Sequence, residues 1–283
     1  MFMQPKNVVW ITGAGGRLGS AIESELDHEK YTIIPTDLEV DITDLTTVNE
    51  AVSNYRPEFI INCAAMASKA DAERNPDLAF KVNALGARNL AIAASGVGAT
   101  LVHLSTDDVF SGIAPHPLNE FDATIPISVF GRSKAAGERL VRELCPSHII
   151  IRSSWVYAAH ENDFLYKYIQ QVKAGEKAVV PANQFAAPTS ASTMAKFMVA
   201  AIESGEFGTF HAVSQGICSR HEFVKTAFDL LGIPLTSLTS SNEFRDSYSI
   251  ELDDLMMRLT GVYEMPTWQE DLRQNIDQYA HLV

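Results

Sequence analysis

A glycine-rich loop near the start of the chain has the residue types that bind phosphate. The loop, Thr12-Gly13-Ala14-Gly15-Gly16-Arg17-Leu18-Gly19, follows an apolar run and precedes a segment of helical periodicity. Gly13 permits a tight turn, Gly16 lets a phosphate approach the backbone, and Gly19 lets the helix pack closely on the strand. Because the free N–H groups of the helix's first turn face an anion, the loop predicts a dinucleotide site.

Asp37 indicates which dinucleotide would bind. It follows the next apolar run, 31–35, and lies 24 residues after Gly13. A carboxylate there can accept a hydrogen bond from a ribose 2′-hydroxyl and repels a 2′-phosphate, so it favours NAD over NADP. Arg17 in the glycine loop could offset this preference, and a solvated loop aspartate is the alternative interpretation of Asp37.

Small and polar side chains follow two later strands. Cys63, Ala64 and Ala65 come after the run 59–62 and leave room for a flat ligand, and the run 101–104 leads into Ser105-Thr106-Asp107-Asp108. Ligands of parallel α/β sheets bind beyond the carboxyl ends of the strands. We therefore expect the chemistry in these two segments.

The elements that must position these residues alternate between strand and helix. Strands are expected at 8–11, 31–35, 59–62, 101–104 and 149–151, with helices at 18–26, 45–55, 75–95 and 130–144 between them. This alternation predicts an α/β fold with a doubly wound parallel sheet of the Rossmann type.

The C-terminal part has a less regular pattern. We expect helices at 164–174 and 190–203, a short strand at 178–180, and two more helices after the capping-box patterns at Ser219 and Thr267. The prediction is a dinucleotide-binding domain, 1–154, and a smaller α/β substrate lobe, 155–283. Within that lobe, the segment of about 178–205 is expected to return to the first domain.

Composition excludes several classes of function. The net charge of −13 argues against nucleic acid and anionic membrane as partners. The three cysteines and eight histidines have no metal-ligand spacing, so no metal site is expected, and the cysteines indicate reduced thiols in a cytoplasmic protein. No signal peptide and no membrane span is expected. The expected oligomeric state is a monomer or a homodimer.

Motifs over nearly the whole chain resemble the extended short-chain dehydrogenase/reductase family, and within it the dTDP-4-dehydrorhamnose reductase group. The motifs that carry the resemblance are Thr12 to Gly19, Asn62-Cys63-Ala64-Ala65, Ser105-Thr106-Asp107, Arg152-Ser153-Ser154-Trp155-Val156-Tyr157, Gln184-Phe185-Ala186-Ala187-Pro188-Thr189, Tyr248-Ser249 and Met265-Pro266-Thr267-Trp268. The resemblance implies an oxidoreductase of nucleotide-sugar metabolism, in dTDP-rhamnose biosynthesis, that binds NAD or NADP.

The resemblance also implies roles for single residues. In the family, hydride passes from NAD(P)H to a keto group on a nucleotide-linked sugar, and the Tyr of a Tyr-x-x-x-Lys motif donates the proton. Thr106 matches the residue that bonds the substrate oxygen, and Lys134 matches the lysine that binds nicotinamide ribose. The implied cofactor-binding residues are Gly13, Gly15, Gly16, Arg17, Leu18, Gly19, Asp37, Asp41, Ile42, Cys63, Ala64, Ala65 and Lys134. The implied substrate residues are Lys69, Asp107, Asp108, Trp155 and Arg245.

The chain departs from the family pattern in the substrate pocket. Phe130 stands at the position of the catalytic Tyr, and loss of a general acid slows a reaction by roughly 10²–10⁴-fold. Asp108 replaces a Tyr, Lys69 a Val, Ala70 an Asp, and Asp246 a Pro. Linked changes indicate a rebuilt pocket, in which Lys69 and Asp108 either pair with each other or point to solvent.

Two functions are consistent with these departures. In the first, the protein is an oxidoreductase with weak or altered activity, and Asp108 is the substitute proton donor, its pKa raised by an apolar pocket. In the second, it is a non-catalytic cofactor-binding subunit with a regulatory or scaffold role. The lost Tyr favours the second function, and the retained Thr106 and Lys134 favour the first.

Overall fold

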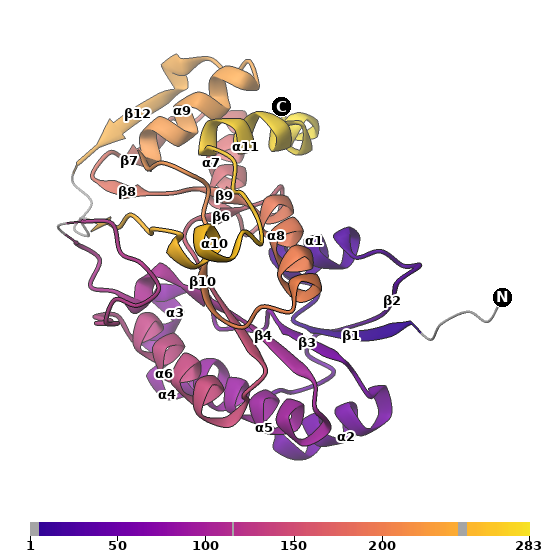
Figure 1. The fold of residues 1–283 in the computed structure, drawn as a ribbon. Coiled ribbons are helices and arrows are strands. Elements are labelled where there is room, and N and C mark those ends of the chain that lie inside the picture. The colour runs from indigo at the N-terminus through magenta and orange to yellow at the C-terminus, as the bar shows by residue number, and fades with distance from the viewer. Residues whose placement is uncertain (1–5, 115, 243–247) are drawn as a thin grey trace.

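Six parallel strands form the central sheet of the computed structural model, which describes residues 6–114, 116–242 and 248–283 (Figure 1). The strands are β1 (Asn7–Thr12), β2 (Tyr31–Thr36), β3 (Phe59–Asn62), β4 (Thr100–Thr106), β5 (His148–Ser153) and β10 (Gly208–His211), in the order β2-β1-β3-β4-β5-β10. The five strands expected from the sequence are present. β10 was not predicted, because its short run Gly-Thr-Phe-His has no apolar periodicity.

Helices cover both faces of this sheet. On one face lie α1 (Arg17–Glu25) and α8 (Ala191–Ser204), and on the other α2 (Leu45–Tyr55), α5 (Ala87–Val97) and α6 (Val129–Leu144) (Figure 1). Side chains of β1 alternate between the two cores: Val9 and Ile11 pack with α8, and Trp10 packs with α2 and α5. Burial on both faces explains why these strands are almost wholly apolar. The arrangement of strands and helices confirms the expected doubly wound Rossmann-type fold.

The segment between β3 and β4 differs from the single helix expected over 75–95. It comprises α3 (Lys69–Arg74), α4 (Pro76–Phe80), the π-helical turn η1 (Lys81–Gly86) and then α5. Pro76 does begin α4, but the Asn75 side chain makes no capping bond to it, because Asn75 also ends α3 with its N–H bonded to the Asp71 carbonyl. α3 places Lys69 at its first position.

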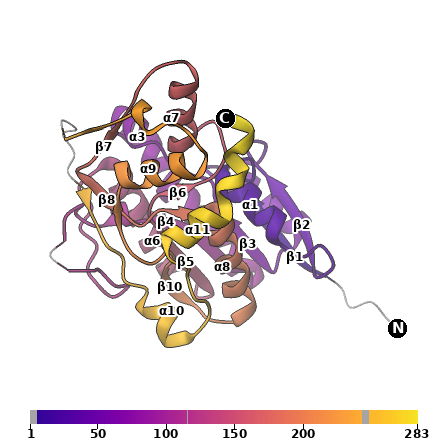
Figure 2. The same ribbon diagram turned by 90° about the horizontal axis from the view of Figure 1, so that it is seen from above.

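The C-terminal lobe has a core of its own. It contains α7 (Phe164–Lys173), α9 (Arg220–Leu230), α11 (Trp268–Asn275) and the 3₁₀ turns η3 (Leu235–Ser237) and η4 (Ile276–Leu282). β7 (Ala178–Pro181) pairs with β12 (Leu238–Ser241), and β8 (Gln184–Ala186) lies between β11 (Cys218–Ser219) and β13 (Tyr248–Ser249). From above, α7, α9 and α11 gather over the sheet, and β2 stays clear of them at its edge (Figure 2).

The chain returns from the lobe to the sheet through α8 and β10. α8 packs against α1, and β10 then pairs with β5 from Gly208 to His211. Shorter elements join the parts: η2 (Asp107–Val109), β6 (Val156–Tyr157), which pairs with β9 (Thr189–Ser190), and α10 (Leu255–Thr260). None of the described helices is long and apolar enough to span a membrane.

The buried carboxylate of Asp271 on α11 connects these returning segments. It is fully buried and accepts hydrogen bonds from the Tyr157 hydroxyl at 3.0 Å, the Ser190 N–H at 2.6 Å and the Thr193 hydroxyl at 2.6 Å. The hydroxyls of Ser190 and Ser214 and the Asn275 amide also donate to it. One side chain thus joins β6, β9, α8 and α11.

We predict that Asp271→Ala lowers the free energy of unfolding by about 3 kcal/mol or more, because it leaves several buried donors without an acceptor. Urea unfolding followed by circular dichroism measures the change. Glu270→Gln is the matched control on the same helix, since Glu270 is exposed and completes only the capping box. An equal effect of the two substitutions would contradict the role of Asp271.

Candidate active site

The glycine loop lies at the carboxyl end of β1, where the strand order reverses between β1 and β3. Gly13 has a φ of +66°, and a Cβ built on it would lie 2.6 Å from the Ala64 backbone nitrogen. A Cβ on Gly19 would lie 2.4 Å from the Gly13 carbonyl oxygen. Larger residues therefore do not fit at either position. This is the crevice in which open α/β sheets bind ligands.

A cleft of about 730 Å³ opens beside this loop. Of the residues expected to bind a cofactor or act in catalysis, it is lined by Gly13, Gly16, Arg17, Leu18, Gly19, Cys63, Ala65, Phe130 and Lys134. It is also lined by Val156, which belongs to the motif from Arg152 to Tyr157, and by His160, Asn162 and Lys167, which the sequence analysis did not single out. All four come from the C-terminal lobe, and no local motif marks the last three.

Five further residues expected at the cofactor are not part of the cleft lining: Gly15, Asp37, Asp41, Ile42 and Ala64. The Asp37 carboxylate at the end of β2 accepts a hydrogen bond of 3.0 Å from the Gly15 N–H. Asp41 is exposed, and hydrogen bonds from the Thr43 hydroxyl and the Thr43 N–H lower its pKa. Ile42 is buried. Ala64 lies directly under Gly13.

Arg17 reaches from the glycine loop to the C-terminal lobe. Its guanidinium donates to the Val156 carbonyl at 2.9 Å and pairs with the Asp163 carboxylate at 3.4 Å. Asp163 in turn caps α7 by accepting from the Leu165 and Tyr166 N–H groups. The positive charge of Arg17 is thereby directed to the lobe and away from Asp37.

Thr106 and Asp107 lie at the carboxyl end of β4. The Thr106 hydroxyl donates to the Asp107 carboxylate at 3.1 Å, and the Ser154 hydroxyl donates to the same carboxylate at 2.6 Å. Asp107 is buried and has no cation within ion-pair distance among the residues that the structure describes. Hydroxyl groups therefore hold it in place.

Lys134 on α6 is buried at the back of the cleft, and its ammonium donates to the Leu104 carbonyl. Burial lowers the pKa of Lys134 to about 8, and the nearby Glu138 opposes this shift. The group is thus a fixed donor beside the glycine loop. It could hold a ribose hydroxyl there.

Phe130 lies one helical turn before Lys134, and its ring lines the cleft. It is buried and packs against Met66, Ala72, Ala79 and Val129. No hydroxyl is present at the position where the family has its proton donor. The surrounding side chains are apolar, so they do not replace it.

Lys69 and Asp108 form an ion pair, one of the two arrangements expected from the sequence. The Lys69 Nζ lies 2.6 Å from Asp108 Oδ1 and 5.0 Å from the centre of the Tyr248 ring. The other oxygen, Oδ2, lies 3.5 Å from the Thr106 hydroxyl. Burial and the Asp107 charge raise the pKa of Asp108 to about 6, and Lys69 opposes them.

Trp155, the remaining described residue expected at the substrate, stacks against a cation. The Arg220 guanidinium lies 4.0 Å from the Trp155 ring and 4.6 Å from the Phe164 ring, and its Nε donates to Gln184 at 3.3 Å. Sequence analysis did not single out Arg220. Arg245 and Asp246 lie outside the described residues.

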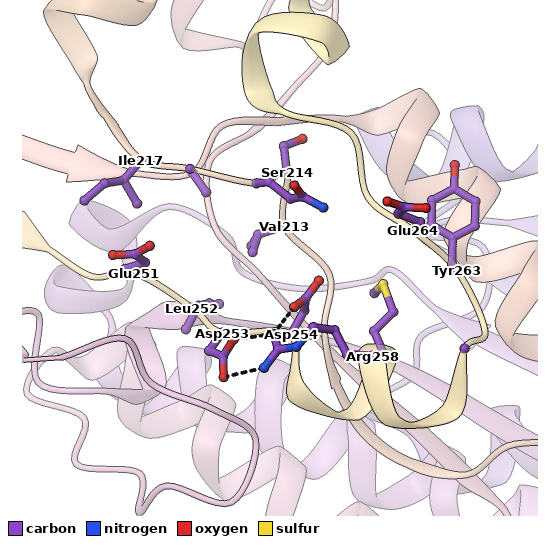
Figure 3. A pocket seen from close by; sticks show the side chains of 15 residues that line it. Val213, Ser214, Ile217, Glu251, Leu252, Asp253, Asp254, Arg258, Tyr263 and Glu264 are labelled. Atoms are coloured by element: carbon purple, nitrogen blue, oxygen red, sulfur yellow. Dashed lines mark hydrogen bonds and ion pairs between the residues drawn. The ribbon is translucent and has the colours of Figure 1, made fainter.

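A second pocket, of about 650 Å³, lies between α10 and the segment 213–217. Figure 3 shows the carboxylates of Glu251, Asp253, Asp254 and Glu264 around it, with Arg258 bonded to Asp253 and Asp254. This surplus of negative charge repels phosphate. Of the two pockets, the cleft at the glycine loop is therefore the one suited to a dinucleotide.

Comparisons with known proteins agree with this geometry. Residues 7–281 match the family model described as RmlD substrate binding domain. A dTDP-4-keto-6-deoxy-D-glucose reductase of Streptomyces niveus is 36% identical, over 93% of this chain and 94% of the relative. The dTDP-4-dehydrorhamnose reductase of Escherichia coli is also 36% identical, over 72% of this chain and 71% of the relative. A crystal structure of dTDP-4-dehydrorhamnose reductase from Bacillus anthracis in complex with NADP has a TM-score of 0.92 and 38% identity, covering 97% of this chain and 99% of that chain.

We predict that Asp108→Asn stabilises the folded protein at pH 8. The folded-state pKa of Asp108 lies above its ordinary value of 3.8, so the folded chain loses stability as the pH rises through about 6 and the carboxyl ionises. Removing that ionisation raises the free energy of unfolding by about 1–3 kcal/mol at pH 8 and by much less at pH 4.

Urea unfolding of the wild-type protein and of the Asp108→Asn variant at pH 4 and pH 8 tests this prediction. Asp41→Asn is a control of opposite sign, because the pKa of Asp41 is lowered and its loss at pH 8 is destabilising. A stability difference for Asp108→Asn that does not grow with pH would contradict the predicted direction.

Proposed function

Because the chain belongs to the family of the RmlD substrate binding domain, within the extended short-chain dehydrogenases/reductases, we propose that it is an NAD(P)H-dependent reductase of a keto group on a nucleotide-linked sugar. The observation that supports this proposal is the cleft itself. A glycine loop that tolerates no side chain at Gly13 or Gly19 opens onto Lys134, and the end of β4 beside it carries Thr106.

The residues present fit a nicotinamide dinucleotide. The N–H groups at the start of α1 would hold the pyrophosphate, and the Lys134 ammonium would bond the nicotinamide ribose. A bound reduced nicotinamide supplies hydride. Thr106 would donate a hydrogen bond to the substrate's carbonyl oxygen, turning from Asp107 to do so. Asp107, Asp108, Lys69 and Trp155 would surround the sugar.

We propose the division into a dinucleotide-binding domain, 1–154, and a substrate lobe, 155–283, as the arrangement that encloses the substrate. In support of it, Val156 to Lys167 of the lobe complete the cleft. α8 and β10 rejoin the first domain, whereas β7 at 178–181 stays in the lobe beside β12. The segment that returns is therefore 191–211 in this proposal.

A non-catalytic cofactor-binding subunit is the second candidate function, and Phe130 is the observation that favours it. The named relatives are reductases, however, and the substrate side of the cleft carries paired charges instead of an apolar filling. A protein that only bound a dinucleotide would not need Lys69 and Asp108 facing each other there. We therefore favour the reductase.

We predict that Asp37 discriminates against NADP(H). Asp37→Asn keeps an oxygen for the Gly15 N–H and removes the charge that repels a 2′-phosphate. The ratio of the Kd values for NADPH and NADH should fall by about tenfold, equivalent to about 1.4 kcal/mol. Fluorescence titration measures both constants, and Asp27→Asn, in the loop that precedes β2, controls for net charge. An unchanged ratio would make Asp37 a structural loop residue only.

We predict that the wild-type protein oxidises NADPH in the presence of dTDP-4-keto-6-deoxy-D-glucose, and that Phe130→Tyr alone changes the rate less than about tenfold. Lys69 and Asp108 still occupy the sugar side of the pocket in that variant. Combining Phe130→Tyr with Lys69→Val and Asp108→Tyr should accelerate the reaction in a strongly non-additive way, because the three residues share one site. Absorbance at 340 nm follows the reaction. If the wild type and the triple variant both bind NADPH and neither oxidises it, the result would support the non-catalytic subunit.

A further inference from the structure

Resting on the proposed reductase activity, we propose that Lys69 donates the proton to the substrate's carbonyl oxygen and that Asp108 positions Lys69 for this step. Lys69 would then be the catalytic residue that replaces the missing Tyr, and Asp108 a positioning residue. The assignment differs from the sequence expectation, in which Asp108 itself is the acid.

The geometry brings Lys69 close to Thr106, the residue that would bond the substrate's carbonyl oxygen. Its ammonium contacts Asp108 Oδ1 at 2.6 Å, and Asp108 Oδ2 lies 3.5 Å from the Thr106 hydroxyl. A carbonyl oxygen bonded by Thr106 therefore lies on the same side as the pair. Lys69 has a flexible four-carbon stem, so its ammonium can turn from the carboxylate to that oxygen.

The ion pair determines which partner carries the proton. A carboxylate held at 2.6 Å by an ammonium is ionised, so Asp108 has no proton to give while the pair exists. An ammonium has three.

Local helix electrostatics do not account for a lysine at this position. Lys69 is the first residue of α3, where the helix dipole disfavours a cation. The features that hold its charge are instead the Asp108 carboxylate and the Tyr248 ring. Both belong to elements on the far side of the pocket, η2 and β13.

Four other titratable groups near Thr106 and Asp108 are less suited to donate this proton. Asp107 accepts from Thr106 and Ser154, Lys134 donates to the Leu104 carbonyl, and Arg220 stacks between two rings. Tyr248 has a pKa raised well above 10 by burial and by the two aspartates, which makes it a weaker acid than an ordinary phenol. His160 and Lys167 line the cleft from the C-terminal lobe, whereas Lys69 contacts Asp108 beside Thr106, so Lys69 is the donor that we propose.

The step balances with the proposed activity. Hydride adds to the carbonyl carbon, the C=O π bond breaks, and the oxygen takes one proton from Lys69 Nζ, which becomes a neutral amine. The Lys69 side chain is 54% exposed, so it regains a proton directly from water. The Asp108 side chain is only 12% exposed and stays charged throughout the step.

Three substitutions test the assignment with NADPH and dTDP-4-keto-6-deoxy-D-glucose. Lys69→Met removes the acid, and Lys69→Arg keeps the charge and the pairing but presents a guanidinium that does not release protons near neutral pH. We expect both to lower kcat by roughly 10²–10⁴-fold, with Lys69→Arg changing KM by less than about threefold. Asp108→Asn should lower kcat less, by about tenfold. Lys225→Met, on the exposed surface of α9, controls for loss of charge.

The pH dependence separates the two candidate acids. With Lys69 as the donor, wild-type kcat rises as Asp108 ionises through about pH 6 and does not fall between pH 6 and pH 7. With Asp108 as the donor, kcat falls above pH 6. Full activity of Lys69→Arg, or a profile that falls above pH 6, would overturn the proposal.

The restored variant Lys69→Val/Asp108→Tyr/Phe130→Tyr distinguishes this inference from the function on which it rests. Activity of that variant beside an inactive wild type would refute the role of Lys69 and keep the reductase class. If neither protein oxidises NADPH although both bind it, the proposed function itself fails.

Discussion

The hydrogen bonds that converge on the Asp271 carboxylate determine how the two parts of this chain meet. Tyr157, Ser190, Thr193 and Ser214 donate to it from segments that lead into or out of the central sheet. Because a buried carboxylate needs its donors at short range, these segments have little freedom to move apart. The neighbours of Tyr157 are thereby fixed as well: Val156, next to it, lines the cleft and accepts from Arg17.

The proposed substrate side of the cleft has the opposite character, because its charges are only partly compensated. Asp107 and Asp108 are adjacent acids, held by hydroxyls and by one half-exposed lysine. A fold selected for stability alone would fill such a space with apolar side chains, which often stabilise more than a buried ion pair. The pair at Lys69 and Asp108 therefore indicates a site that gives up stability for recognition or chemistry.

Much of the fold could be predicted from the sequence because the relevant signals are local. The apolar strands, the glycine loop and the caps of Thr267 and Ser219 depend on residues near one another in the chain. β10 and α3 escaped prediction, since the first is short and the second follows no apolar period. The lobe's contribution to the cleft, His160, Asn162 and Lys167, depends on tertiary contact and has no sequence signature.

The residues of the candidate site fall into the same two groups, those marked by a local motif and those placed by tertiary contacts. The glycines and Lys134 could be placed from their motifs, and they lie together at the cleft. The direction of a long side chain could not be predicted from the sequence. Arg17 turns to Val156 and Asp163 instead of the ribose end, and Lys69 reaches across to η2 and β13. Both choices follow from partners that are more than 35 residues away in the chain.

The late return of the chain to its own sheet also has a consequence for how the protein folds. The face of β1 that carries Val9 and Ile11 is covered partly by Met194, Phe197 and Met198 of α8, and the last strand of the sheet ends at His211. A nascent chain that has emerged only to residue 154 exposes this apolar face. The N-terminal half can bury the core on the other face of its sheet, but this face has to wait for contacts between residues nearly 200 positions apart in the sequence, which is typical of slow folding that depends on protection from aggregation.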